Sequence, residues 1–195
     1  MRYFVTGEQN RQLLLNAIVL LFLAYMLVFW VSIGMMYFHQ MNLTPASVVE
    51  YYLGAESKFT QPRSYRSLLE VSHAHLFSMG MLAVTLAHLL LFANVSTGLK
   101  VGLSVLVFFS AIAEEAAGWL VRFAHPAFAW FKIGAFVTLE LSLAALIVLV
   151  AASLIAQRSD LKQASQKRSH HPLHADAENP RARSRAAART PVTKA

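Results

Sequence analysis

Four long apolar stretches constrain the fold of this chain more than any other feature. They cover about residues 13–38, 70–93, 101–121 and 131–156. Each reaches the roughly 20 residues that a helix needs to cross the hydrocarbon core of a bilayer. Hydrophobic residues make up 56% of the chain and charged residues only 14%, a balance unsuited to a small soluble domain. The sequence therefore predicts an integral membrane protein.

The connections after the second and third stretches are short, and short loops place consecutive helices antiparallel. We therefore expect an all-α, up-down-up-down four-helix bundle over residues 13–156. The first stretch is longer than the apolar region of a secretory signal, and no small-residue cleavage site follows it. It is expected to remain in the protein as the first span.

Basic residues are divided unequally between the two sides of such a bundle. With the N-terminus in the cytoplasm, that side holds 12 of the 17 Lys and Arg residues, nine of them after residue 156. The other side holds the remaining five, which are Lys58, Arg63, Arg66, Arg122 and Lys132. Because basic residues beside a span resist translocation, we expect a multi-pass protein of the inner (plasma) membrane with this orientation. Both termini, including a short segment 1–12, are expected to be cytoplasmic.

The C-terminal segment 157–195 is polar and basic, and it contains His170, His171 and His174. We expect it to be disordered and to contact anionic lipid at the cytoplasmic surface. Its histidines can bind a metal ion, but a solvated tail explains them more simply. The net charge of +7 is thus explained by basic residues on the cytoplasmic side of the membrane. No motif combines basic and aromatic residues as a nucleic-acid binder does.

The one long connection, residues 39–69, contains the signals of a short helix. Thr44 can cap a helix, Pro45 suits its first position, and Gly54 can end it. We expect a helix over residues 45–53 that lies at the membrane surface. Its Val48, Tyr51 and Tyr52 side chains would then face the lipid headgroups.

Ionisable residues inside membrane spans mark candidate sites, because exposing them to lipid is costly. At 100° per residue, one face of the second span carries Glu70, His73, Phe77, Gly80, Val84 and His88. His75 lies on the opposite face with Leu82, Leu86 and Leu89. We expect the His73 face to point into the bundle, and His75 to be dispensable at the membrane surface.

Similar inward-facing stripes are expected on the other spans. The first span carries Tyr25, Phe29, Ser32, Met36 and His39, and the third carries Ser104, Phe108, Ala111, Glu115, Gly118, Trp119 and Arg122. Glu140 is the acidic residue of the fourth span, and Glu114 is expected beside lipid in a neutral form. From the helical rise, His39, His73 and His125 lie at one level near the outer boundary, with Glu115 about 10 Å deeper.

Histidines at one level favour a haem site. A bis-histidine haem b needs two neutral imidazoles from different segments at one depth. His73 is the first predicted ligand, and His39 or His125 is the second. His88, about 22 Å further along the same face, marks a second level that has no matching histidine. Such a protein would act as an electron carrier or as a subunit of a membrane complex with other redox subunits.

Two alternatives remain open. The first is a non-haem site for iron, zinc or copper, formed by His73, His39, His125, Glu70 and Glu115. The second is a helper or assembly subunit without a cofactor, whose polar residues hold helices together. Glu70 also completes an S-x-x-E capping box with Ser67, and Arg122 can pair with Glu115. The sequence does not identify a reaction or decide whether the protein is an enzyme.

Two motifs, LLEVSHAHLFSMGML at residues 68–82 and RFAHPAFAW at residues 122–130, resemble a little-characterised family of small bacterial four-span inner-membrane proteins. The resemblance covers spans two and three with their outer ends. It implies the four-span fold and no established reaction. The histidine-bearing bundle is also similar in outline to b-type cytochromes, although it lacks the paired histidines on two helices that a diheme cytochrome b carries.

Overall fold

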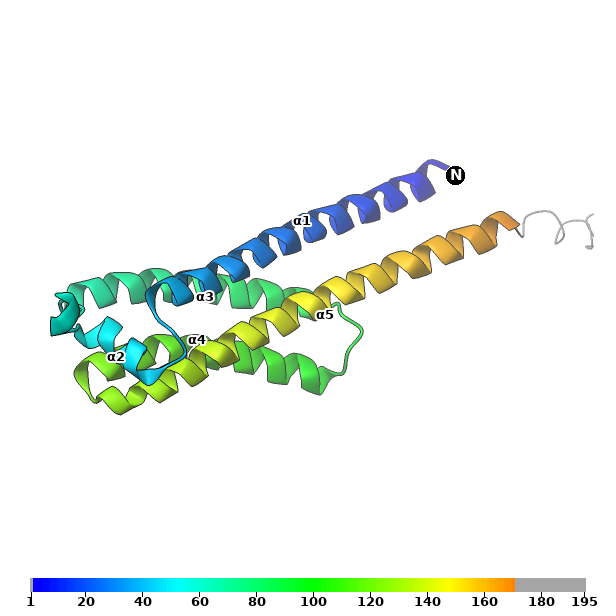
Figure 1. Ribbon diagram of the computed structural model, residues 1–195. Helices are drawn as coiled ribbons and strands as arrows, with labels where there is room; N and C mark the ends of the chain where they lie inside the picture. Colours follow the sequence, from blue (N-terminus) through cyan, green and yellow to red (C-terminus); the bar gives the residue numbers. More distant parts are fainter. Residues whose placement is uncertain (1, 171–195) are drawn as a thin grey trace, which may run out of the picture. The chain divides into compact units, whose positions relative to one another are not determined.

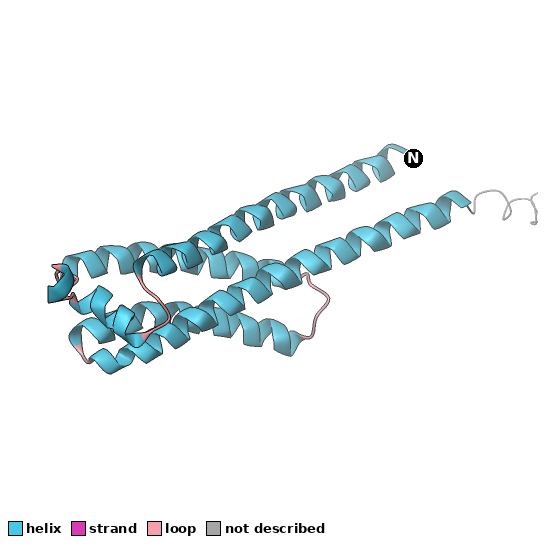
Figure 2. Cartoon of the chain, in the orientation of Figure 1, coloured by secondary structure: helices cyan, strands magenta, loops and turns pink. Residues whose placement is uncertain are grey.

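The computed structural model of the protein describes residues 2–170, and these residues are almost entirely helical (Figures 1 and 2). The elements are α1 (Arg2–Gln40), α2 (Pro45–Leu53), η1 (Glu56–Lys58), α3 (Tyr65–Leu90), α4 (Thr97–Phe123), η2 (Pro126–Phe128) and α5 (Ala129–His170). No β-strand occurs in this described part, where Ala55 and Thr60 form one isolated antiparallel bridge. The predicted all-α class is therefore confirmed.

Four helices are long and apolar enough to cross a membrane. The candidate spans are Leu14–Gln40, Tyr65–Leu90, Thr97–Phe123 and Pro126–Ser159. Consecutive spans run in opposite directions, as the colour gradient of Figure 1 shows. The chain thus forms the predicted up-down-up-down bundle, with α2 at the end where α1 connects to α3; we call this end the α2 end.

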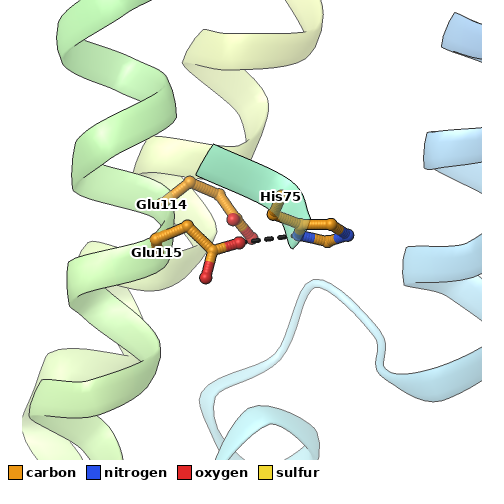
Figure 3. Close-up of side chains that lie close together, drawn as sticks. All are labelled: His75, Glu114 and Glu115. Carbon is orange, nitrogen blue, oxygen red and sulfur yellow. Dashed lines mark hydrogen bonds and ion pairs between the residues drawn. The ribbon is translucent and has the colours of Figure 1, made fainter. Parts of the chain in front are cut away.

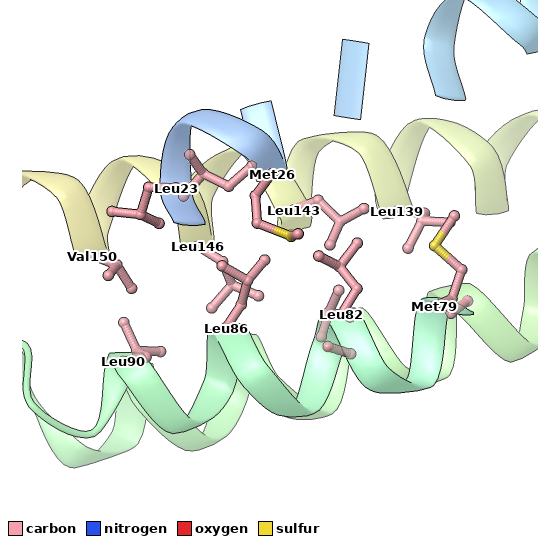
Figure 4. Packing of buried hydrophobic residues seen from close by; sticks show 14 of the residues in the cluster. Leu23, Met26, Met79, Leu82, Leu86, Leu90, Leu139, Leu143, Leu146 and Val150 are labelled. Carbon is pink, nitrogen blue, oxygen red and sulfur yellow. The ribbon is translucent and has the colours of Figure 1, made fainter. Parts of the chain in front are cut away.

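The bundle is held together by an apolar cluster to which α1, α3, α4 and α5 all contribute, and part of it is drawn in Figure 4. On α3, buried residues recur three, four or seven positions apart as Leu68, Ser72, Met79, Leu82, Leu86 and Leu90. Leu86 and Leu146 are completely buried. This spacing places one apolar stripe of α3 against the neighbouring helices.

The predicted inward face of α3 is wrong. Glu70, His73 and His88 are exposed, whereas His75 is half-buried on the side of the buried leucines. The leucine stripe offers much more surface for packing between helices than the stripe that carries His73. Glu70 and His73 also lie near the start of α3, where polar side chains can reach headgroups or water at little cost.

The other two predicted faces have different outcomes. On α1 the stripe is wrong, because Tyr25, Ser32, Met36 and His39 are exposed, while Leu23, Met26 and Tyr37 are buried. On α4 the predicted stripe is confirmed: Ala111 and Gly118 are buried, and its other members are half-buried.

Helix α2 has the predicted bounds but lies elsewhere than expected. It begins at Pro45 and ends before Gly54, whose φ of 78° suits a residue without a side chain. Val48 is 0% and Tyr52 5% exposed, and both pack in a second apolar cluster with residues of α1, α3, α4 and α5. The prediction that these side chains face headgroups is wrong, because they fill the α2 end of the bundle.

The ends of α3 and α5 also differ from expectation. Helix α3 begins at Tyr65, capped by the Ser64 hydroxyl, so the predicted capping box at Ser67 does not form and Glu70 pairs with Arg66 instead. Helix α5 continues to His170, so residues 157–170 are helical rather than disordered; no proline interrupts them. His171, His174 and the predicted lipid-binding remainder of the tail lie outside the described residues. The chain divides into one compact unit of residues 1–154 and a second from Ile155 onward.

Candidate functional site

The α2 end of the bundle contains a cavity of about 480 Å³. Its walls come from α1, α3, α4 and α5, and from the connection that contains α2. Most of the lining is apolar. The polar lining residues are concentrated on α3 and α4 and at the start of α5.

His75 and Glu115 both line this cavity, and they form the close pair drawn in Figure 3. The Nδ1 atom of His75 lies 2.6 Å from Oε1 of Glu115. The second carboxylate oxygen of Glu115 accepts a hydrogen bond of 2.8 Å from the Ser72 hydroxyl. Ser72 in turn accepts a bond of 2.8 Å from Nε1 of Trp119. Both oxygens of Glu115 are therefore held by neighbours, and its carboxylate orients the imidazole.

Glu114 and Lys132 form a second pair beside the first. The Lys132 ammonium contacts the Glu114 carboxylate and donates a bond of 2.9 Å to the Glu114 backbone oxygen. The Glu114 side chain is only 13% exposed and that of Lys132 only 5%, so the pair is removed from solvent. Glu114 is thus paired with a cation, and the prediction that it lies neutral beside lipid is wrong.

Tyr52 connects α2 to this pair. The Lys132 nitrogen lies 5.7 Å from the centre of the Tyr52 ring. Burial of the phenol raises the pKa of Tyr52 to about 12, despite the opposing effect of the Lys132 charge. The hydroxyl therefore stays protonated at neutral pH.

Three potential metal ligands converge at this site. One nitrogen of His75 and one carboxylate oxygen each from Glu114 and Glu115 lie within 4.8 Å of one another. In Figure 3 the two glutamates project from α4 toward the histidine on α3. A cation between them would replace the proton that His75 and Glu115 share.

The histidines predicted as ligands lie elsewhere. His39, His73, His88 and His125 are all exposed, and the converging group found among residues 2–170 includes none of them. The ring of His125 accepts a bond of 3.1 Å from the Ala127 amide and caps η2. His88 packs edge-on against Phe92. Of the predicted metal ligands, Glu115 alone belongs to this converging group.

The remaining predicted polar residues have other contacts. Nε of Arg122 donates a bond of 2.8 Å to the backbone oxygen of Arg63, in place of the predicted pairing with Glu115. Glu140 has one carboxylate oxygen that is buried without a hydrogen-bond partner in the described structure. Its backbone oxygen accepts a bond of 3.0 Å from Nε1 of Trp30, which connects α1 to α5.

Sequence reasoning missed His75, Lys132 and Ser72. Ser72 and His75 lie in register with the buried residues Leu68, Met79, Leu82, Leu86 and Leu90, so the apolar stripe of α3 carries the signal that finds them. Lys132 was counted only as a basic residue outside the membrane. A lone lysine at the start of an apolar span was the available signal.

The helical transmembrane fold agrees with a comparison against protein families. Residues 42–161, more than half of the chain, match the model of Aq_1264_TM, described as a transmembrane helical domain. The chain belongs to this family. The match to Aq_1264_TM covers α2, three of the four spans and all the residues of the two ion pairs. It does not test the similarity to b-type cytochromes. No curated protein and no solved structure matches the chain.

Proposed function

We propose that this integral membrane protein binds a divalent transition-metal ion through His75, Glu114 and Glu115. The convergence of their three ligand atoms within 4.8 Å carries the proposal. It adopts the non-haem alternative of the sequence analysis with a different ligand set. The orientation predicted from basic residues, with both termini in the cytoplasm, would place the site near the outer face of a bacterial inner membrane.

The donor set supports this chemistry. One imidazole nitrogen and two carboxylate oxygens suit zinc, iron and manganese. Ser72, which itself accepts a bond from Trp119, holds the Glu115 carboxylate, and Lys132 pairs with that of Glu114. Such outer contacts orient ligands and commonly contribute about 10–100-fold to metal affinity. Three protein ligands would leave further positions open toward the cavity.

The charge balance also favours a cation. With His75 neutral, the two carboxylates and the Lys132 ammonium sum to one negative charge in a partly buried site. Either a proton on His75 or a metal ion can compensate this charge. Metal binding is therefore expected to release a proton, and to weaken as the pH falls.

The haem hypothesis remains a prediction. It requires His73 with His39 or His125, and these imidazoles are exposed on three different segments. Electron transfer and association with redox subunits depend on that hypothesis. A spectrum of the dithionite-reduced protein tests it in the same preparation, because a Soret band that disappears with His73→Ala would support haem over the proposed metal site.

The matched pair His75→Ala and His73→Ala tests the proposed site. We expect cobalt(II), added to protein from which a chelator has removed bound metal, to give visible absorption bands. It should bind at about one ion per chain. His75→Ala and Glu114→Gln should each weaken binding by at least about tenfold, because each removes a ligand, whereas His73→Ala and Glu70→Gln should leave it unchanged. Equal binding by His75→Ala and His73→Ala would contradict the proposal, as would no binding by the wild type.

A further inference from the structure

We propose that the cavity also binds a membrane-soluble amphiphile with a phenol- or quinol-type head, whose ring hydroxyl donates a hydrogen bond to Nε2 of His75. This goes beyond metal binding, because it uses the cavity and the other nitrogen of the imidazole. It does not require an ion at the site.

The shape of the cavity indicates an elongated ligand. Its lining runs from Phe29 to Met41 on one side and from Ser67 to Met79 on α3. Each stretch corresponds to about 18 Å along a helix. The volume of about 480 Å³ falls within the usual range of small-molecule sites, roughly 300–1,000 Å³. A single apolar chain with one head group fits these proportions.

Polarity changes along this length. Gln40, Arg63 and Ser67 line the end near α2, whereas Phe29 and Leu139 line the opposite end. An amphiphile would therefore lie with its chain toward the middle of the bundle. The polar end also adjoins a second, more polar cavity of about 670 Å³, which shares Arg63 in its lining.

The cavity is accessible from the side of the bundle. Met36 of α1 and Val71 of α3 both line it, and they remain 52% and 46% exposed. At the level of the spans, the surroundings of these helices are lipid. A ligand dissolved in the bilayer could therefore enter between α1 and α3.

The hydrogen-bonding state of His75 determines the type of head group. Nδ1 faces the Glu115 carboxylate, so in the neutral imidazole the proton lies on Nδ1 and Nε2 is an acceptor. The proposed ligand binds this neutral form of His75. The His75 side chain is 40% exposed, and in Figure 3 its second ring nitrogen points away from both carboxylates. The complementary group is a hydroxyl that donates.

Aromatic side chains in the cavity lining favour a ligand whose hydroxyl is attached to a flat aromatic ring. Tyr52, Trp119 and Phe136 line the cavity together with Met36 and Met79. Aromatic rings and thioethers both make favourable contacts with an aromatic ligand. A phenol or quinol combines the ring, the donating hydroxyl and the capacity to carry an apolar chain.

A matched pair of probes tests the hydroxyl. Binding of para-octylphenol and of its methyl ether would be measured by calorimetry on the purified, chelator-treated protein at mildly alkaline pH, which favours the neutral imidazole. The phenol should bind about tenfold more tightly than the ether in the wild type, a difference that one good hydrogen bond supplies. His75→Ala should abolish that preference, whereas His73→Ala should retain it, because His73 is exposed and lies outside the cavity lining. Equal affinities of the two probes for the wild type would overturn the proposed hydrogen bond.

A matched pair of variants tests the location. Ala74 and Ala116 are both exposed, but only Ala74 lines the cavity. Ala74→Phe should weaken phenol binding by at least about tenfold, because the added ring occupies the cavity, and Ala116→Phe should leave it unchanged. Equal effects of the two variants would overturn the proposed location.

The experiment also separates this proposal from the metal site. An ion bound on the Nδ1 side would leave the imidazole proton on Nε2, which would then donate rather than accept. Saturation with zinc should therefore weaken phenol binding and remove the preference for phenol over ether. Phenol binding by a protein that binds no metal would refute the proposed metal function alone, whereas metal binding without phenol binding would refute this inference alone.

Discussion

Gly118→Ala probes the contact that holds α2 against the bundle. A Cβ atom at position 118 would lie 2.6 Å from the Tyr52 hydroxyl oxygen and 2.9 Å from Cζ of the same ring. Tyr52 is 5% exposed, so the ring has little room to withdraw. The substitution should therefore push Tyr52, and α2 with it, away from α4.

The size of the effect follows from two opposing contributions. Overpacking a closely packed interior costs about 1–3 kcal/mol. Alanine is favoured over glycine within a helix by roughly 0.5–1 kcal/mol. The net loss of unfolding free energy should be about 1–2 kcal/mol. Gly102→Ala on the same helix is the control: nothing lies within 4 Å of its added Cβ, so it should be neutral or slightly stabilising.

Thermal unfolding of the purified protein measures this difference, and thiol labelling shows where it arises. The chain has no cysteine, so Val48→Cys places one thiol at a completely buried position of α2. The thiol should react faster when Gly118→Ala is added, but not when Gly102→Ala is added. If Gly118→Ala is as stable as Gly102→Ala and the thiol stays protected, the Tyr52–Gly118 contact does not hold α2 in place.

Three further predictions concern the buried charges and the topology. Lys132→Met should lower the unfolding free energy by about 3–5 kcal/mol, because it leaves Glu114 as an unpaired buried charge, and adding Glu114→Gln should recover most of this loss in denaturation measurements. Because the pKa of Tyr52 is raised to about 12 from its ordinary value of 10.0, the folded state holds this proton more tightly. Stability should therefore fall by up to about 2–3 kcal/mol from pH 10 to pH 12, and Tyr52→Phe should lack this part of the loss. Reporter fusions at the C-terminus and after Ser57 should report the cytoplasm and the opposite side, respectively, and the reverse pattern would contradict the predicted orientation.

The helices were predictable because their signals are local. The length of each apolar stretch predicts a span wherever the rest of the chain lies. Pro45 and Gly54 mark the ends of α2 through their own backbone preferences, and both ends agree with the structure. Local signals do not, however, show what a helix packs against. Val48 and Tyr52 are predicted at the membrane surface because the local sequence of the connection 39–69 gives no indication that it folds back into the bundle.

The site was harder to predict because its residues meet only after the helices pack. Lys132 reaches Glu114 because η2 reverses the chain between α4 and α5. His75 and Glu115 belong to different helices, and their pairing depends on the rotation of α3 about its axis. An error in that rotation turns His73 toward the interior of the bundle, where the structure has His75. This single error accounts for most of the differences between the predicted and observed sites.

The contrast between α3 and α4 shows which signal should determine the rotation. On α4, the small residues Ala111 and Gly118 lie on the same face as Glu115, so packing and polarity indicate the same inward side, and the prediction is confirmed. On α3 the two signals conflict, because most polar residues lie on one face and the leucines lie on the other. Packing decides the outcome, since the exposed polar residues near the start of the helix can reach water or headgroups. The polar residues that matter on such a helix are those within the apolar stripe, which on α3 are Ser72 and His75.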